Sequence, residues 1–182
     1  ISVFTKEFLE DIGATNIEDI TAYSVNSDNN LNDGASAQLT NSDPIITIRG
    51  MAGGGAGGGN TGRFTNFFQS SVTQDTFNME RAELTRGPNS VLFGVGSPSG
   101  GFNVGTKKPD VSRGSSTATF RFGSWNEARG TLDVNQPIIR HKLGLRLNAM
   151  QGDRNDWRPF GFNEEERHQF NVRWQIARQT RV

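Results

Sequence analysis

Four segments in the second half of the chain alternate strictly between apolar and polar residues. They are residues 117–123, 131–135, 143–149 and 169–177. In the third, LGLRLNA, the first, third, fifth and seventh positions are leucines and an alanine, and the positions between them are Gly, Arg and Asn. Successive side chains of a strand point to opposite faces, so a period of two predicts β-strands with one apolar and one polar face. We expect four antiparallel strands with one short link and longer polar ones.

Two kinds of protein fit such strands. A soluble antiparallel sheet would need a second layer over its apolar face, and no other segment obviously supplies one. In a membrane β-barrel the apolar face contacts lipid, and the polar face, here including Asp133 and Arg146, lines a wet interior. Spans of roughly ten residues with alternating short and long links fit the barrel, and we favour it.

The start of the chain has the signals of two short helices. Thr5 precedes an apolar stripe that Gly13 ends, and Asn16 precedes a second stripe that reaches Tyr23. Thr and Asn are good N-cap residues, because their side-chain oxygens accept hydrogen bonds from the first backbone N–H groups of a helix. We expect a helix after each of these two residues.

Short strands and loops fill the rest of the first half. Strands are expected at residues 45–49, in the NMERAELTRG stretch and at 100–109, with Ala82 and Leu84 on one face. RFTNFF is a short strand or loop, NSVLFG is one helical turn, and residues 26–43 and the glycine-rich stretch after Met51 are loops. Short helices and strands in mixed order predict an α+β unit.

Composition excludes several classes of protein. The chain has 182 residues, 33% of them hydrophobic, with 22 Gly, 13 Phe, no Cys and two His. Without Cys there is no disulfide framework or thiolate metal site, and two isolated His do not indicate a metal centre. The net charge is zero, but residues 1–106 carry 5 Lys and Arg against 11 Asp and Glu. No basic patch interleaved with aromatics indicates nucleic-acid binding.

The glycine-rich stretch RGPNSVLFGVGSPSGGFNVGTKKP at residues 86–109 does not indicate a nucleotide site. A phosphate-binding P-loop needs Gly-Lys-Ser or Gly-Lys-Thr, which this chain lacks. Three residues separate Gly96 from Gly100, whereas the dinucleotide-binding fingerprint G-x-G-x-x-G has two at this place. Pro98 also lies where the helix of that motif would begin. Tight turns between short strands explain the glycines better.

Three motifs in order make the chain resemble the plug-to-barrel junction of TonB-dependent outer-membrane receptors, most closely the ferric siderophore branch. They are ITIRG at residues 46–50, MERAELTRGPNSVLFG at 79–94 and GGFNVGTKKP at 100–109. The resemblance implies an α+β plug domain in residues 1–109. Residues 110–182 are then the first antiparallel transmembrane strands of a partial β-barrel.

The resemblance also implies roles for individual residues. Arg49 and Arg86 match the two plug arginines that pair with glutamates on the barrel wall; without the motif they would be exposed strand-end residues. Residues at the apical ligand-binding position are Arg63, Phe64, Phe67, Phe68 and Gln69. Each of these Phe residues can equally belong to the plug core. Structural positions of the plug motifs are Gly50, Glu80, Arg81, Gly87, Pro88, Gly94, Gly100, Gly101 and Asn103.

The function implied is active transport across the outer membrane. A ferric siderophore or similar chelate would be imported with energy from the inner-membrane TonB complex, and the strands would contact outer-membrane lipid. The protein would be no enzyme and would need no cofactor. Uptake of cobalamin or a saccharide stays open, as does a non-transport surface protein. The chain begins without Met and supplies about four of many barrel strands, so we expect a fragment that lacks the coupling box.

Overall fold

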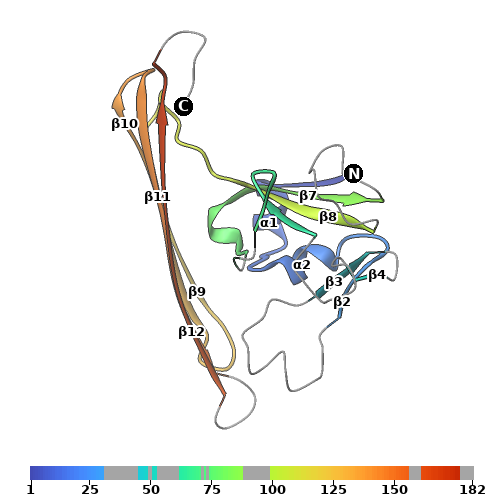
Figure 1. The fold of residues 1–182 in the computed structure, drawn as a ribbon. Helices are drawn as coiled ribbons and strands as arrows, with labels where there is room; N and C mark the ends of the chain where they lie inside the picture. The colour runs from blue at the N-terminus through green and yellow to red at the C-terminus, as the bar shows by residue number, and fades with distance from the viewer. Residues whose placement is uncertain are drawn as a thin grey trace. The chain divides into compact units, whose positions relative to one another are not determined.

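The structure is a computed structural model that describes residues 1–30, 45–48, 51–52, 62–70, 72, 74–87, 99–155 and 161–176. The chain divides into two compact units, Ile1–Thr106 and Lys107–Val182 (Figure 1). We call them the N-terminal and the C-terminal unit and describe each by itself.

A five-stranded sheet organises the N-terminal unit. Its strands, in spatial order, are β1 (Ser2–Thr5), β7 (Met79–Arg86), β8 (Gly100–Thr106), β5 (Arg63–Thr65) and β6 (Phe68–Gln69). Neighbouring strands are antiparallel except for β5 and β8, which run parallel. The two longest strands, β7 and β8, therefore lie at the centre, where both edges of each are hydrogen-bonded.

The hydrophobic core lies between this sheet and two helices, α1 (Lys6–Asp11) and α2 (Ile17–Thr21). Ala82 and Leu84 are fully buried, which confirms the apolar face predicted for β7. Other buried core residues are Phe4, Leu9, Ala14, Ile17, Ile20, Ile48, Met79, Phe102 and Val104. Full burial of one large aliphatic side chain contributes about 1.5–3 kcal/mol, so this cluster supplies the main driving force for folding the unit.

Both predicted helix caps are present. Thr5 Oγ1 accepts a hydrogen bond from the Phe8 N–H at 3.4 Å, and Asn16 Oδ1 accepts one from the Asp19 N–H at 3.0 Å. Gly13, at a φ of 65°, follows the first helix as predicted. The caps satisfy backbone N–H groups that have no partner within a helix.

A second, three-stranded sheet corrects one prediction. Its strands are β2 (Ser27–Asn30), β3 (Ile45–Ile48) and β4 (Met51–Ala52), with β3 in the middle. The sequence predicted a loop from residue 26 onward, because SDNN has no apolar alternation. Backbone pairing with β3 makes this stretch a strand, and such pairing leaves no mark on side-chain polarity.

Two further local predictions can be placed. A 3₁₀ turn, η1 (Thr76–Asn78), precedes β7, and RFTNFF forms the hairpin of β5 and β6. The helical turn predicted at NSVLFG and most of the glycine-rich stretch after Met51 lie outside the described residues.

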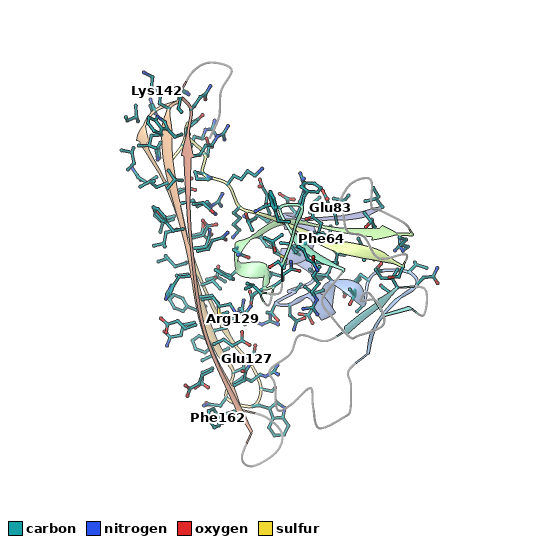
Figure 2. The ribbon with its side chains drawn as sticks, in the orientation of Figure 1. Phe64, Glu83, Glu127, Arg129, Lys142 and Phe162 are labelled. Carbon is teal, nitrogen blue, oxygen red and sulfur yellow. The ribbon has the colours of Figure 1, made fainter. Side chains whose placement is uncertain are left out.

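The C-terminal unit is a four-stranded sheet of consecutive antiparallel strands, as predicted. The strands are β9 (Ser115–Phe122), β10 (Ala128–Ile139), β11 (Leu143–Asn155) and β12 (Phe162–Trp174). They are longer than the alternating segments, since backbone pairing continues beyond the strictly patterned residues. Lys142 lies at the end with the short β10–β11 turn, and Phe162 lies near the other end (Figure 2).

Among the described residues, no helix is both long and apolar enough to cross a membrane.

The start of β8 yields a prediction about Gly100. Its φ is 130°, and a Cβ there would lie 2.1 Å from the Thr85 carbonyl oxygen. Gly100→Ala should destabilise the N-terminal unit by about 2 kcal/mol or more, since both the clash and the backbone conformation oppose a side chain. Amide hydrogen exchange of β7 and β8 would measure the loss.

Gly105→Ala is the matched control in the same strand. Its new Cβ would meet only the flexible Arg81 side chain, at 3.0 Å. Protection in β7 and β8 should stay close to that of the unmodified protein. Equal effects of the two substitutions would contradict the role of Gly100.

Candidate functional site

The predicted ligand-binding residues divide into a buried and an exposed group. Arg63 and Phe64 are buried, with Phe64 only 1% exposed. Phe67 and Phe68 lie on the tip of the β5–β6 hairpin, and Phe68 is 78% exposed. Gln69 beside them is also exposed. Phe64 therefore packs in the interior of the N-terminal unit (labelled in Figure 2), and only the tip offers side chains to a partner.

The hairpin tip has an unusual backbone that other residues hold in place. Asn66 and Phe67 both have positive φ, 52° and 70°. Asn adopts this backbone more readily than most residues, whereas it is costly for a bulky residue such as Phe. The Asn66 amide donates to Thr106 Oγ1 at 2.8 Å and accepts from the Thr106 N–H at 3.1 Å. These bonds attach the tip to the end of β8.

A chain of polar contacts connects this tip to the predicted motif residues. The Phe67 N–H donates to Asn103 Oδ1 at 3.0 Å, and Asn103 Nδ2 donates to Glu83 Oε2 at 3.1 Å. Glu83 Oε1 in turn pairs with Arg81 Nε at 2.8 Å. Asn103 is fully buried, so its amide acts as the bridge between β7 and the tip.

Other motif positions lie at the opposite end of β7 and β8. The Gly87 N–H donates to the Ser99 carbonyl at 2.9 Å, and Gly87 has a φ of 89°. Gly100 and Gly101 pair with Arg86 and Thr85 in the first rungs of the ladder. Glu80 is exposed on β7.

Four predicted residues, Arg49, Gly50, Pro88 and Gly94, lie outside the described residues.

Arg86 binds three groups of its own unit. Its Nε donates to the Val25 carbonyl at 3.0 Å, its Nη1 to Ser2 Oγ at 3.0 Å and its Nη2 to Ser24 Oγ at 2.7 Å. Arg86 thereby joins the start of β1 to the segment after α2. Its predicted pairing with glutamates of a barrel wall stays a prediction.

Sequence reasoning missed a second assembly. It is formed by residues 107–111, which we call the strap, on the four-stranded sheet. The strap is extended, with Lys107, Pro109 and Val111 buried and the two residues between them exposed. The carbonyl groups of all five strap residues accept hydrogen bonds from the four-stranded sheet or its turn. In order along the strap, the donors are Asn171, Arg146, Arg173, Asn135 and the backbone N–H of His141, at 2.9, 2.9, 3.3, 3.0 and 2.9 Å.

Charge reinforces the binding of the strap. Arg146 makes a bidentate pair with Asp133, with both N–O distances at 2.8 Å. Lys107 Nζ contacts the same carboxylate at 3.0 Å, and all three side chains are mostly buried. One carboxylate thus pairs with a cation of β11 and a cation of the strap. The only available hint in the sequence was Asp and Arg together on the polar face of these strands.

Close packing and a local turn complete the strap. A Cβ at Gly144 would lie 3.3 Å from Pro109 Cβ, so the strap crosses β11 where no side chain intervenes. The Ser112 N–H donates to Asp110 Oδ1 at 2.8 Å, and this bond holds the pKa of the Asp110 carboxyl below its ordinary value. A lowered carboxyl pKa stabilises the fold at neutral pH, and the contribution is lost as the pH falls through that pKa.

The opposite face of the same sheet carries exposed apolar side chains. They are Phe120, Phe122, Leu132, Leu147, Phe170, Val172 and Trp174. In the strand register, Phe120 lies opposite Gly130, whereas Trp174 lies opposite Leu143 near the other end. The apolar band therefore crosses the strands obliquely. Strands that tilt by roughly 35–45° in a membrane barrel would present such a band parallel to the membrane.

The shared carboxylate leads to a prediction about Asp133. Asp133→Asn should lower the free energy of unfolding of the protein by about 3 kcal/mol, because it removes the charge that two mostly buried cations contact. Urea unfolding would measure this. Glu166→Gln is the control: Glu166 pairs with His168 on the surface, where the side chains are 70% and 61% exposed. It should cost no more than about 0.5 kcal/mol, and an equal cost would refute the role of Asp133.

The hairpin tip leads to a prediction about Phe67. Phe67→Gly should stabilise the tip by about 1 kcal/mol, because glycine adopts a φ of 70° without the strain of a side chain. Exchange of the tip amides would report the change. Phe68→Ala, one residue further and not at positive φ, should leave that exchange nearly unchanged. Faster exchange in Phe67→Gly would show that the side chain itself stabilises the turn.

Comparison with known proteins agrees with this organisation. The TonB-dependent Receptor Plug Domain family matches residues 1–101. The chain is 29% identical over 159 residues to the catecholate siderophore receptor Fiu of Escherichia coli, which covers 82% of this chain and 19% of Fiu. It is 28% identical over 194 residues to the ferrioxamine B receptor of Salmonella typhimurium, covering all of this chain and 26% of that protein.

Solved structures show the same fold. The open form of the ferric-catecholate import receptor Fiu superposes with a TM-score of 0.76 at 28% identity, covering 95% of this chain and 24% of Fiu. The ferripyoverdine receptor of the Pseudomonas aeruginosa outer membrane superposes with a TM-score of 0.82 at 18% identity, and the match covers 99% of this chain and 23% of that receptor. At this identity the likeness shows the fold alone. The chain thus spans about a quarter or less of these relatives' lengths. The plug-domain match extends over more than half of the chain, and the protein belongs to the TonB-dependent receptor family.

Proposed function

We propose that the complete protein is an outer-membrane receptor that imports a ferric siderophore with energy from the TonB complex. The observation that carries this proposal is the two-faced sheet that follows the plug domain. Its polar face binds the strap, while its apolar face is exposed along an oblique band. Large exposed apolar surfaces need a partner, and lipid is the partner that fits tilted strands of alternating polarity.

The relatives support a metal chelate as the substrate. The similar proteins are named as receptors for a catecholate siderophore, ferrioxamine B and, in Pseudomonas aeruginosa, metal-pseudopaline. These ligands are all chelators of metal ions or their complexes. We therefore favour a ferric siderophore over cobalamin or a saccharide.

The exposed part of the predicted ligand set supports a role in contacting the chelate. Phe67 and Phe68 offer aromatic surface, and Gln69 offers a polar group beside them. Aromatic rings stack on planar ligand groups, and that attraction is not screened by salt. Arg63 and Phe64 are buried beneath, so we assign them to the support of the tip.

Energy coupling and plug retention complete the proposal. We assign Arg49 and Arg86 to the lock between plug and barrel wall, and in the complete receptor Arg86 would have to exchange contacts with Ser2 or Ser24 for a glutamate. The work of transport comes from the TonB complex. We assign the protein no catalytic activity of its own.

Growth under iron limitation tests the substrate class. A strain that depends on the complete receptor should grow with one or more ferric siderophores, because the receptor is then its sole route for chelated iron. The control strain lacks the receptor. Receptor-dependent uptake of a sugar or cobalamin, with none of any ferric chelate, would overturn the iron assignment.

Binding of the same chelate tests the hairpin tip. The double substitution Phe67→Ala and Phe68→Ala should weaken binding about tenfold or more, since each aromatic contact contributes about 0.5–1.5 kcal/mol. Val3→Ala is the control, an exposed apolar residue on β1 at the opposite edge of the sheet. Unchanged affinity in the double variant would remove the tip from the ligand site.

A further inference from the structure

The sheet of the C-terminal unit binds the strap as it would bind an extended peptide. Five consecutive strap carbonyls accept hydrogen bonds, four of them from side chains of β10, β11 and β12. The fifth accepts from the backbone of the short turn. Asn135 binds one strap residue twice, because its Oδ1 accepts from the Asp110 N–H at 2.8 Å and its Nδ2 donates to the Asp110 carbonyl.

The donors lie in matching register across the sheet. Asn135, Arg146 and Asn171 are directly opposite one another on β10, β11 and β12, and Arg173 lies two residues beyond Asn171. These side chains form a row that follows the strap. The row contacts backbone atoms, so the strap is held along its whole length and not by a single side chain.

Separating the strap from the sheet would leave several polar groups without partners at once. Asn135 is almost fully buried, and the Asp133 carboxylate would keep Arg146 but lose Lys107. Each buried polar group that loses its partner opposes separation, and the penalties accumulate because the contacts break together. β1, by comparison, is a four-residue edge strand that pairs on one side only.

We propose that the strap stays bound to the sheet throughout transport, so that rearrangement of the plug ends at Thr106. The strap then acts as a fixed anchor, and the segment that moves to admit the chelate lies before it in the chain. This inference rests on the proposed transport function. It adds the position in the chain at which the moving part of the plug ends.

A disulfide between strap and sheet tests the anchor. In Pro109→Cys, Gly144→Cys the two Cβ atoms would be 3.3 Å apart, close to the roughly 3.5–4.5 Å that a disulfide spans. The chain has no cysteine of its own. Uptake of the iron(III) complex of dihydroxybenzoic acid, labelled with radioactive iron, is measured in cells with the variant receptor oxidised and then reduced. A shift in gel mobility after proteolysis reports the fraction cross-linked.

The oxidised receptor should take up iron within about twofold of the reduced one, because a bound strap loses nothing by being cross-linked. A loss of tenfold or more that reduction restores would overturn the proposal. Uptake by the unmodified receptor is measured in parallel. If that receptor imports no iron, the proposed substrate is wrong, and the comparison is repeated with the chelate or nutrient that it does import.

Thiol labelling provides a second measurement that needs no cross-link. Val111→Cys places a small thiol at a buried strap position. It should resist a membrane-impermeant maleimide equally in resting cells and in cells importing the substrate. Phe162→Cys, at an exposed position near the start of β12, is the control that should react in both. Labelling of Val111→Cys that appears only during import would show that the strap leaves the sheet.

Discussion

The need to hydrogen-bond every buried backbone group governs the C-terminal unit. An extended segment that crosses the face of a sheet cannot join the ladder, so its carbonyls must find side-chain donors. The strap meets this constraint with Asn and Arg side chains that alternate along the polar faces of the strands. The polar residues of this face are therefore ligands for the chain itself, and a glycine, Gly144, leaves the space for the crossing.

The N-terminal unit solves the same problem at the hairpin tip. The two turn residues have left-handed backbone, and a buried amide, Asn103, binds the N–H of Phe67. Glu83 and Arg81 extend this contact along β7. These charged residues thus support the irregular backbone of the hairpin tip.

The two faces of the C-terminal sheet connect structure to the proposed function. One face is satisfied by the strap, and the other carries aromatic and aliphatic side chains that remain exposed. A soluble protein would cover such a band with a second layer, whereas lipid covers it in a membrane. The strap and the apolar band therefore lie on opposite faces of one sheet.

The sequence by itself determined the elements whose signals are local. Period-two alternation located four strands, the caps at Thr5 and Asn16 located two helices, and Ala82 with Leu84 identified the buried face of β7. Only the tertiary structure decided which Phe is core and which is exposed, that SDNN is a strand, and that the strap lies on the sheet. Those outcomes depend on partners far away in the chain: Asn171 is 64 residues from Lys107, and Ser2 is 84 residues from Arg86. A side chain's own polarity does not encode which distant backbone it will meet, so these contacts appear only when the chain is folded.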